Sequence, residues 1–482
     1  MPMMTGAEYI ESLRKLNTEI YAFGQKIENF VDHPLFRPHI NAAAVTYDMA
    51  HEPEFEDLVT VKSHLTGKKI NRFTHIHQST EDLVKKVKML RMIAQRTGTC
   101  FQRCVGFDGL NALYSVTYEM DQALGTGYHK RFVEFLKYVQ ENDLMSAGSM
   151  TDPKGDRGLR PSQQADPDMY VRVVKKTGEG IVIRGAKAHQ TGIVNSHYMV
   201  IMPTVALGEA DRDYAVACAV PVDAPGIFHV FGRQTNDERR LEGEIDTGNA
   251  RYGIVGGEAL TVLEDVFVPW DKVFMCGEYQ YAGMLVERFA SYHRQNYGGC
   301  KCGVSDIIIG ATMTLAEYNG AAKASHIKDK ITEMLHLSET LYCCSIACSA
   351  EGRKTASGAY YVDPLLANIV KQNVTRHIYE ICRLAHDIAG GFIATLPSEK
   401  DFLSPKTGPF LEKYFRGVAG VPTEHRVRIA RLVENMTGGT ALAESMHGAG
   451  SPQTQRVMIM RQSNMEHKKR LARKLAGIPE QE

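Results

Sequence analysis

The chain lacks a net charge and lacks any apolar run of membrane length. Its 482 residues include 56 Lys and Arg against 56 Asp and Glu, with no extended basic run. Binding to nucleic acid or to an anionic membrane depends on a positive surface, so we expect neither as the main partner. No stretch approaches the roughly eighteen apolar residues of a membrane helix, and no signal pattern follows the first residues. We therefore expect a cytoplasmic protein, whose near-neutral charge leaves association into an oligomer unopposed.

Helical patterns occupy both ends of the chain, and strand patterns occupy its middle. Apolar residues recur at helical spacing from Thr5 to Leu16, which begins with a capping box, and from Ser79 to Gln95. Strand-like runs begin with a hairpin around Thr177 to Gly180. Further strands are predicted at Tyr198–Met202, Tyr214–Val220, Gly226–Phe231 and Leu260–Val268. We predict an α+β fold of three domains: a helical domain (1–145), an antiparallel β-barrel or sandwich domain (146–275) and a second helical domain (276–482).

Ten cysteines in a large chain without secretory signs indicate reduced thiols or metal ligands and not a disulfide framework. Cys100 and Cys104 are four residues apart, so on a helix they share a face. His293 and Cys300, seven apart, do the same, and the glycines 298 and 299 would admit a bulky group if that segment were not helical. Neither spacing is typical of a zinc site or a ferredoxin, so cysteines buried in a helical core remain the alternative.

The stretch 146–158 is small, polar and glycine-rich. It fits either a linker between domains or a ligand-binding loop. The composition alone does not decide between the two, because the strand-turn-helix context of a phosphate loop is missing.

Motifs along the whole chain resemble the flavin-dependent acyl-CoA dehydrogenase superfamily and, within it, the 4-hydroxybutyryl-CoA dehydratase family. They occur in the family's order: YIESLRKLNT, FTHIHQSTEDL, MTDPKGDRG, GAKAHQTG, ERFASYHRQNYGGCK, ETLYCCSIACSAEG, DIAGG and ESMHGAGSPQTQR. The resemblance implies an acyl-CoA dehydrogenase-like fold and a CoA-thioester substrate. The alternative within the superfamily is an FADH2-dependent aromatic monooxygenase of the 4-hydroxyphenylacetate 3-monooxygenase type, which would lack the metal ligands. A catalytically inactive descendant of the fold is the third possibility.

The resemblance implies that a 4Fe-4S cluster is bound by Cys100, Cys104, His293 and Cys300. A histidine ligand would leave one iron able to act as a Lewis acid toward a substrate oxygen. Cys302, two residues beyond Cys300, could compete as a ligand, although a packed side chain is the simpler interpretation. Cys343, Cys344 and Cys348 are predicted to be buried core in a helix.

The resemblance also implies an FAD site shared between the subunits of a homotetramer. One flavin-contacting loop consists of Met150, Thr151, Asp152, Pro153, Lys154, Gly155, Asp156 and Arg157. A second segment, His189, Gln190 and Thr191, would hydrogen-bond the flavin ring. A third, Asp387, Ile388, Ala389, Gly390 and Gly391, would reach the flavin of a neighbouring subunit. Each segment taken alone is also compatible with an ordinary turn.

The implied reaction is radical dehydration of 4-hydroxybutyryl-CoA to crotonyl-CoA, with isomerisation of vinylacetyl-CoA to the same product. The implied catalytic residues are His293, Glu258, Tyr297, Lys301 and Glu444. Neutral imidazole suits a base for the C3 proton, and burial would suit the carboxyl of Glu258 to acid–base work. From the residues alone, surface carboxylates, a packed tyrosine and a solvated lysine would be the simpler interpretations.

Overall fold

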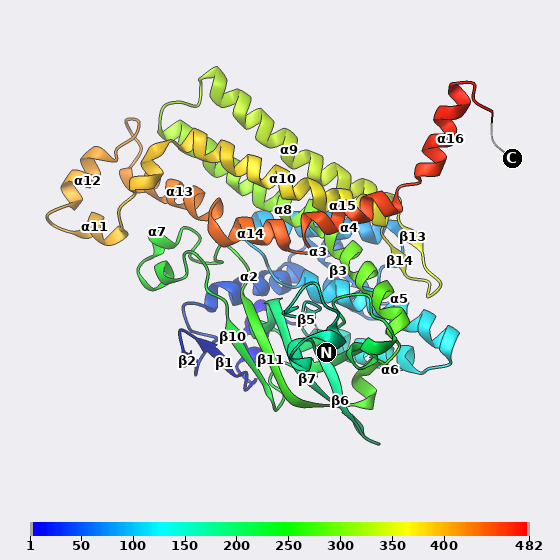
Figure 1. Ribbon diagram of the computed structural model, residues 1–482. Helices are drawn as coiled ribbons and strands as arrows, with labels where there is room; N and C mark the ends of the chain where they lie inside the picture. Colours follow the sequence, from blue (N-terminus) through cyan, green and yellow to red (C-terminus); the bar gives the residue numbers. More distant parts are fainter. Residues whose placement is uncertain (1–2, 480–482) are drawn as a thin grey trace.

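The computed structural model of the protein describes residues 3–479, which form two helical regions around a pair of β-sheets (Figure 1). The helices before the sheets are α1 (Gly6–Leu13), α2 (Arg37–Asp48), α3 (Glu56–Val59), α4 (Thr80–Thr97), α5 (Cys104–Leu124) and α6 (Tyr128–Glu141). After the short helix α7 (Glu244–Thr247) follow α8 (Ala282–Tyr318), α9 (Ser325–Ala350), α10 (Pro364–Ala389), α11 (Glu399–Leu403), α12 (Gly408–Tyr414), α13 (Thr423–Met436), α14 (Gly439–His447), α15 (Pro452–Gln462) and α16 (Met465–Leu475).

The predicted helix starts are confirmed by their caps. The Thr5 hydroxyl accepts a hydrogen bond from the Glu8 amide, and the Glu8 carboxylate accepts one from the Thr5 amide, which completes the capping box of α1. Ser79 caps α4 in the same way by accepting from the amide of Asp82. These local signals therefore suffice to fix where the two helices begin.

The middle of the chain forms two open sheets. The strands are β1 (Ile20–Ala22), β2 (Gln25–Lys26), β5 (Ser146–Ser149), β6 (Arg172–Lys176), β7 (Gly180–Thr191), β8 (Tyr198–Ile201), β9 (Val216–Pro221), β10 (Ile227–Phe231), β11 (Glu258–Pro269) and β12 (Val273–Cys276). One sheet has the order β2-β1-β10-β11-β7-β6 and the other β12-β9-β8-β5. The predicted β6–β7 hairpin is confirmed, with the Thr177 amide donating to the Gly180 carbonyl. Small hairpins are formed by β3 (Thr60–Lys62) with β4 (Lys69–Asn71) and by β13 (Arg353–Lys354) with β14 (Tyr360–Tyr361).

Three predictions about the fold need correction. The sheets are mixed and not purely antiparallel, because β1 pairs with β10 and β5 with β8 in parallel. Among residues 3–479 no strand pairing closes either sheet into a barrel. Residues 1–145 are also not all helical, since β1 and β2 cross from the N-terminal part into the larger sheet. The division of the chain into three domains stays a prediction.

Helix α8 is the central helix of the C-terminal part and packs against α4, α5, α9 and α10. A side-chain carbon added at Gly298 would lie 2.5 Å from the Leu341 carbonyl oxygen of α9, and one added at Gly299 would lie 2.6 Å from the Val87 carbonyl oxygen of α4. The two glycines therefore sit in a helix and let two neighbouring backbones approach. The alternative that they admit a bulky group is tied to a non-helical segment and does not apply to this helix.

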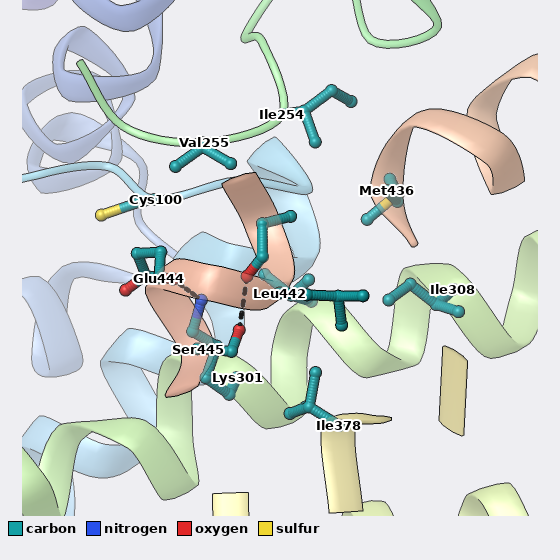
Figure 2. A pocket seen from close by; sticks show the side chains of 12 residues that line it. Cys100, Ile254, Val255, Lys301, Ile308, Ile378, Met436, Leu442, Glu444 and Ser445 are labelled. Atoms are coloured by element: carbon teal, nitrogen blue, oxygen red, sulfur yellow. Dashed lines mark hydrogen bonds and ion pairs between the residues drawn. The ribbon is translucent and has the colours of Figure 1, made fainter. Parts of the chain in front are cut away.

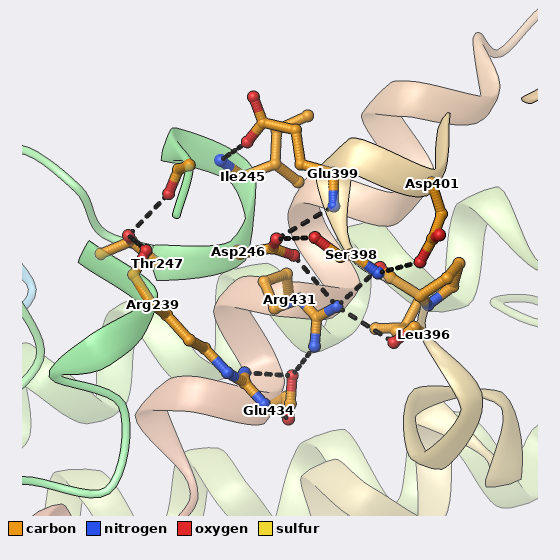
Figure 3. A network of polar contacts seen from close by, with 12 residues as sticks. Arg239, Ile245, Asp246, Thr247, Leu396, Ser398, Glu399, Asp401, Arg431 and Glu434 are labelled. Atoms are coloured by element: carbon orange, nitrogen blue, oxygen red, sulfur yellow. Dashed lines mark hydrogen bonds and ion pairs between the residues drawn. The ribbon is translucent and has the colours of Figure 1, made fainter. Parts of the chain in front are cut away.

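A partly buried polar network ties the connection between β10 and β11 to the C-terminal helices (Figure 3). Asp246 of α7 accepts from the Ser398 hydroxyl at 2.7 Å and lies 3.4 Å from the Arg431 guanidinium of α13. Arg431 also pairs with Glu434 at 2.5 Å, and Glu434 pairs with Arg239 at 3.1 Å. This network anchors the connection whose far end leads into Glu258 of β11.

Candidate active site

The middle of α8 carries four of the predicted site residues on adjoining faces. His293, Tyr297, Cys300 and Lys301 follow one another at helical spacing of four, three and one residues, and the first two are at most 9% exposed. Opposite them lie the start of α5 and the segment before it. Of the two alternatives left open for the segment from His293 to Cys300, the helical one is confirmed.

Cys100 and Cys104 do not share one helical turn, so that prediction is wrong. Helix α5 begins at Cys104, and Gln102 has a φ of 66°, which breaks any helix between the two cysteines. Cys100 instead lies in an extended approach to the helix. The two thiols nevertheless remain close enough for Cys100 to raise the pKa of Cys104.

Three thiols lie near one another, with Cys104 buried and Cys100 and Cys300 half-buried. Burial raises the pKa of Cys100 and Cys104 well above the usual thiol range and raises that of Cys300 to about 11. A thiolate at Cys300 would raise the pKa of the other two thiols further, because like charges oppose each other. Within residues 3–479 none of the three sulfurs has a hydrogen-bond partner. They are therefore neutral, unengaged thiols that a metal centre could deprotonate and bind.

Asp108 orients the imidazole of His293. Its carboxylate accepts from Nδ1 of His293 at 2.8 Å, from the Asn296 amide at 2.5 Å and from the Lys86 ammonium at 2.6 Å. Asp108 and Lys86 are fully buried, so this charge pair is shielded from solvent. Because Nδ1 donates to a carboxylate, the lone pair of Nε2 is left for a metal or a proton.

A second charged group surrounds Glu444 of α14. Its carboxylate accepts from the Tyr297 hydroxyl at 3.2 Å. It also pairs with the Lys301 ammonium (Figure 2). The Lys371 ammonium of α10 lies 4.2 Å from the centre of the Tyr297 ring and donates to the Ser445 carbonyl at 2.5 Å. Burial alone would raise the pKa of Glu444, but the two lysines hold it below its usual range. Burial lowers the pKa of Lys371 to about 7.

Glu258 lies at the first position of β11, directly opposite Thr191 of β7. Both carboxylate oxygens accept from the Thr191 hydroxyl, at 2.8 and 2.9 Å. Burial raises the pKa of Glu258 to about 8, and the negative charge of Glu444 acts in the same direction. The carboxyl can therefore bind and release a proton near neutral pH.

A cavity of about 30 Å³ lies beside these groups (Figure 2). Cys100, Lys301 and Glu444 form its polar wall. Its remaining lining is mainly aliphatic and includes Ile254, Val255, Val304, Ile308, Ile378 and Leu442. Charges placed in such a surrounding interact more strongly than they would in water.

Two of the three predicted flavin segments lie side by side. The Ala188 amide donates to the Thr151 carbonyl at 2.8 Å, which joins the loop 150–157 to the end of β7, residues 189–191. The Lys187 ammonium holds the loop in place by donating to the Asp152 carboxylate at 3.0 Å and to the Met150 carbonyl at 2.9 Å. Lys154 and His189 both have positive φ, 76° and 54°, and such strain is common at ligand sites.

The third predicted flavin segment lies apart from the other two. Residues 387–391 span the end of α10, where Gly390 adopts a φ of 77°. Both Gly390 and Gly391 face open space, and within residues 3–479 no hydrogen bond joins the segment to either other flavin segment. A single chain does not assemble all three.

Cys302 points away from the other thiols, toward α9. Its sulfur lies 3.2 Å from the Ser338 hydroxyl, and it forms with Asp306 and Glu339 a compact group of metal-binding residue types. Arg91 already pairs with both carboxylates, at 2.9 and 2.5 Å. The Arg91 guanidinium thus supplies the positive charge that a metal ion would bring to this group. Because Cys302 faces this group and not the other thiols, it is unsuited to compete with Cys300 as a cluster ligand.

The prediction for the cysteines of α9 is correct in part. Cys348 is buried and Cys344 half-buried, but Cys343 is exposed. Residues 344 and 348 are one turn apart and share a face, whereas 343 lies a third of a turn away.

Asp108, Lys86, Asn296 and Lys371 were not anticipated from the sequence. For Asp108 a signal exists, because it follows Cys104 by four residues and so shares its face of α5. Lys86 and Lys371 come from helices α4 and α10, far away in the chain, and no local pattern marks them.

Comparison with known proteins places the chain in a family. Two family models match it: the N-terminal part of 4-hydroxyphenylacetate 3-hydroxylase over residues 5–275 and the C-terminal part over residues 282–477. A solved structure of 4-hydroxyphenylacetate 3-monooxygenase with FAD has a TM-score of 0.86 at 25% identity and covers 98% of both chains. Glutaryl-coenzyme A dehydrogenase, at 12% identity and a TM-score of 0.51, shares the fold alone and supports the acyl-CoA dehydrogenase-like architecture.

Much greater similarity is found to two dehydratases. The 4-hydroxybutyryl-CoA dehydratase/vinylacetyl-CoA-Delta-isomerase of Clostridium aminobutyricum is 58% identical over 99% of this chain and its own full length. The solved oxygen-tolerant 4-hydroxybutyryl-CoA dehydratase from N. maritimus has a TM-score of 0.97 and 54% identity, and covers 99% of this chain and 96% of its own. The protein is an enzyme and belongs to the 4-hydroxybutyryl-CoA dehydratase/vinylacetyl-CoA-Delta-isomerase family.

Proposed function

We propose that this protein dehydrates 4-hydroxybutyryl-CoA to crotonyl-CoA and isomerises vinylacetyl-CoA to the same product. One observation carries the proposal. Three thiols without hydrogen-bond partners and an imidazole oriented by Asp108 lie close to the acid–base groups Glu258 and Glu444. The similarity to the dehydratase of C. aminobutyricum supports the choice of substrate.

We propose that the chain holds a 4Fe-4S cluster through Cys100, Cys104, Cys300 and His293. The donor set fits such a cluster, since the thiols have no competing partner and the imidazole is fixed by a buried carboxylate, as metal-bound histidines usually are. A cluster with one imidazole ligand supplies a Lewis-acidic iron suited to a hydroxyl group.

FAD is the second proposed cofactor, held by Met150–Arg157 and His189–Thr191 of one subunit and by Asp387–Gly391 of a neighbour in a homotetramer. The joined, strained loop 150–157 and strand end 189–191 support the first part, and the open surface at Gly390 and Gly391 supports the second. FAD in the solved monooxygenase is further support. Bound flavin supplies one-electron oxidation and reduction of the substrate.

The proton balance of the reaction matches the groups in the site. Forming crotonyl-CoA removes one proton each from C2 and C3, and delivers one to C4 and one to the departing hydroxide. Glu258 takes the C2 proton and returns it to C4, because its pKa near 8 permits both steps. His293 would take the C3 proton through Nε2 only when that nitrogen is released from iron, while Asp108 holds Nδ1.

Tyr297 and Lys301 serve the departing oxygen. The Tyr297 hydroxyl, bound to Glu444, can donate a proton toward hydroxide, and the Lys301 ammonium can restore it through the same carboxylate. The aliphatic cavity wall limits water near these groups.

No helix among residues 3–479 is long and apolar enough to cross a membrane.

The test is a metal analysis combined with two assays. Anaerobically purified protein is expected to contain flavin and about four irons per chain and to convert both thioesters. Isomerisation needs only the C2-to-C4 proton shift, so His293→Gln should lose dehydration far more than isomerisation and should retain flavin. Flavin without iron, together with hydroxylation of phenols, would instead identify the monooxygenase. Iron-loaded protein that is inert toward both thioesters would contradict the proposal.

A further inference from the structure

The cavity of about 30 Å³ beside Glu444 has a polar side and an aliphatic side (Figure 2). Cys100, Lys301 and Glu444 lie together on the polar side. Met436 and Ile308 lie on the opposite side. A volume of this size has room for about two waters, and a buried water needs about two to four polar partners. The polar side is therefore the part of the cavity that can hold a water.

Lys301 and Glu444 keep hydrogen-bonding capacity beyond their own ion pair. An ammonium has three N–H donors, but within residues 3–479 that of Lys301 has one hydrogen-bond partner, the Glu444 carboxylate. That carboxylate accepts from Lys301 and from the Tyr297 hydroxyl, and a carboxylate has about four acceptor sites. The two side chains remain 12% and 23% exposed, so a water-sized molecule can touch both. Together they supply the partners that a held water needs.

The cavity lies to one side of the proposed cluster site. Of the four proposed cluster ligands, all within the described residues, only Cys100 lines it. Tyr297, whose hydroxyl is bound to Glu444, does not line it either. The Glu444 carboxylate therefore touches both the cavity and the Tyr297 hydroxyl, and connects the two.

We propose that the polar side of this cavity receives the water that dehydration releases. The C4–O bond breaks with its electron pair on oxygen, and a proton from the Tyr297 hydroxyl completes the water. The proton removed from C3 replaces that proton in the overall balance. The Lys301 ammonium then donates to the water oxygen, and the Glu444 carboxylate accepts one of its hydrogens. The inference rests on the proposed function, since it names where the second product of that reaction is held.

The aliphatic walls give this water a defined place. They keep bulk water away from the reacting groups, while the ion pair at one side binds the single molecule that each turnover produces. A water held by the ion pair is also removed from C4, so it does not add back to the product before the product leaves.

Isomerisation provides an internal comparison. Vinylacetyl-CoA and crotonyl-CoA are isomers, so their interconversion neither releases nor consumes water. A side chain that fills the cavity should therefore slow dehydration and spare isomerisation. Loss of a group that moves the C2 proton would slow both.

The experiment fills the cavity from two walls, with Ala441→Leu in α14 and Ile378→Phe in α10. Ala443→Leu is the matched control, because Ala443 lies in the same helix but is exposed and does not line the cavity. In both filled variants kcat for dehydration should fall at least about tenfold, since the departing water loses hydrogen bonds to charged groups. Isomerisation, iron content and flavin content should stay near the wild-type values, and the control should behave as the wild type.

A second measurement does not depend on activity. Crystals of the wild-type protein should show an ordered water within hydrogen-bond distance of both Lys301 Nζ and a Glu444 carboxylate oxygen. Xenon under pressure should not replace it, because xenon enters cavities that are apolar and dry. In Ala441→Leu crystals the water should be missing while the pair of Lys301 and Glu444 remains.

Three results would overturn the inference: xenon in place of the water, undiminished dehydration in both filled variants, or an equal loss of both reactions with iron and flavin intact. If one filled variant loses its iron, the other variant and the wild-type crystals decide. Failure of the proposed function has a different signature. In that case the wild-type crystals would show the ordered water, and yet the wild-type protein would turn over neither thioester.

Discussion

Two faces of α8 each carry a cysteine close to other metal-binding residue types, but their surroundings differ. On the face toward α5, Cys300 lies with Cys100 and Cys104, and their sulfurs have no hydrogen-bond partners within residues 3–479. On the face toward α9, Cys302 is bound to Ser338, and its neighbours Asp306 and Glu339 are paired with Arg91. The second group is the more compact of the two.

Compactness is therefore a poor guide to a metal centre in this protein. A bare metal ion needs ligand atoms close together, whereas a cluster of several metals spreads its ligands around its own volume. Ligands that already have partners must give them up before they bind a metal. The residues around each sulfur, and not their number, distinguish the two faces.

The largest expected effect comes from removing one thiol on each face. Cys300→Ala should lose most of its iron and reduce dehydration by more than about a hundredfold, since even residues that only support metal ligands cost up to that much. Cys302→Ala should keep about four irons and near-normal activity. Iron analysis and crotonyl-CoA formation, measured on both variants purified side by side, check this. The reverse pattern would place the cluster on the α9 face.

Asp108 is expected to have the next largest effect. Asp108→Asn removes the anion that fixes Nδ1 of His293, so iron retention or dehydration should fall about ten- to a hundredfold. Because it also leaves Lys86 buried without a counter-charge, Lys86→Met/Asp108→Asn serves as the variant that restores neutrality. Asp306→Asn is the matched change on the other face and should leave iron unchanged. Full iron and activity in the double variant would show that Asp108 matters only for folding.

Glu444 and Glu339 offer the same comparison for stability. Glu444→Gln leaves Lys301 and Lys371 in the interior without a carboxylate and should lower the free energy of unfolding by about 3 kcal/mol. Glu339 is half exposed, so Glu339→Gln should cost less than about 1 kcal/mol. Burial alone would raise the pKa of Glu444, but Lys301 and Lys371 hold that pKa below 4.5 in the folded protein. The stabilisation of the fold by the Glu444 carboxylate is therefore complete above pH 4.5. It is lost as the pH falls through the lowered pKa of the folded state. Denaturant unfolding at pH 7 and pH 4 measures the free energy of unfolding of both variants. Equal losses of stability in Glu444→Gln and Glu339→Gln at pH 7 would refute the buried charge pairing of Glu444.

The sequence alone predicts the features that depend on neighbours in the chain. Capping residues locate the starts of α1 and α4, and the turn at Thr177 to Gly180 locates the β6–β7 hairpin. The helical spacing of His293 and Cys300 is likewise confirmed. The acid–base residues Glu258 and Glu444 came from family resemblance, because nothing local distinguishes them from surface carboxylates.

Features that depend on distant segments were missed. The positive φ of Gln102 separates Cys100 from α5, and no residue type at that position announces it. The pairing of β1 with β10 joins residues some two hundred positions apart. Asp108 gains its importance only when α5 packs against α8 and brings it to His293. These three features are set by tertiary packing, which local periodicity in the sequence does not encode.

The smallest expected effect concerns the pH dependence set by Glu258. Burial raises its pKa to about 8, and the hydrogen bond from Thr191 opposes that rise by stabilising the carboxylate. If the carboxylate takes the C2 proton, kcat/KM for vinylacetyl-CoA isomerisation should climb with pH and level off above about 8. Thr191→Val should move that bend upward by up to about one pH unit, because one hydrogen bond is worth about 1 kcal/mol. Thr191→Ser keeps the hydroxyl and should leave the bend in place. A bend that stays fixed in the valine variant, or that persists in Glu258→Gln, would assign the titration to another group, such as Lys371, whose pKa lies near 7.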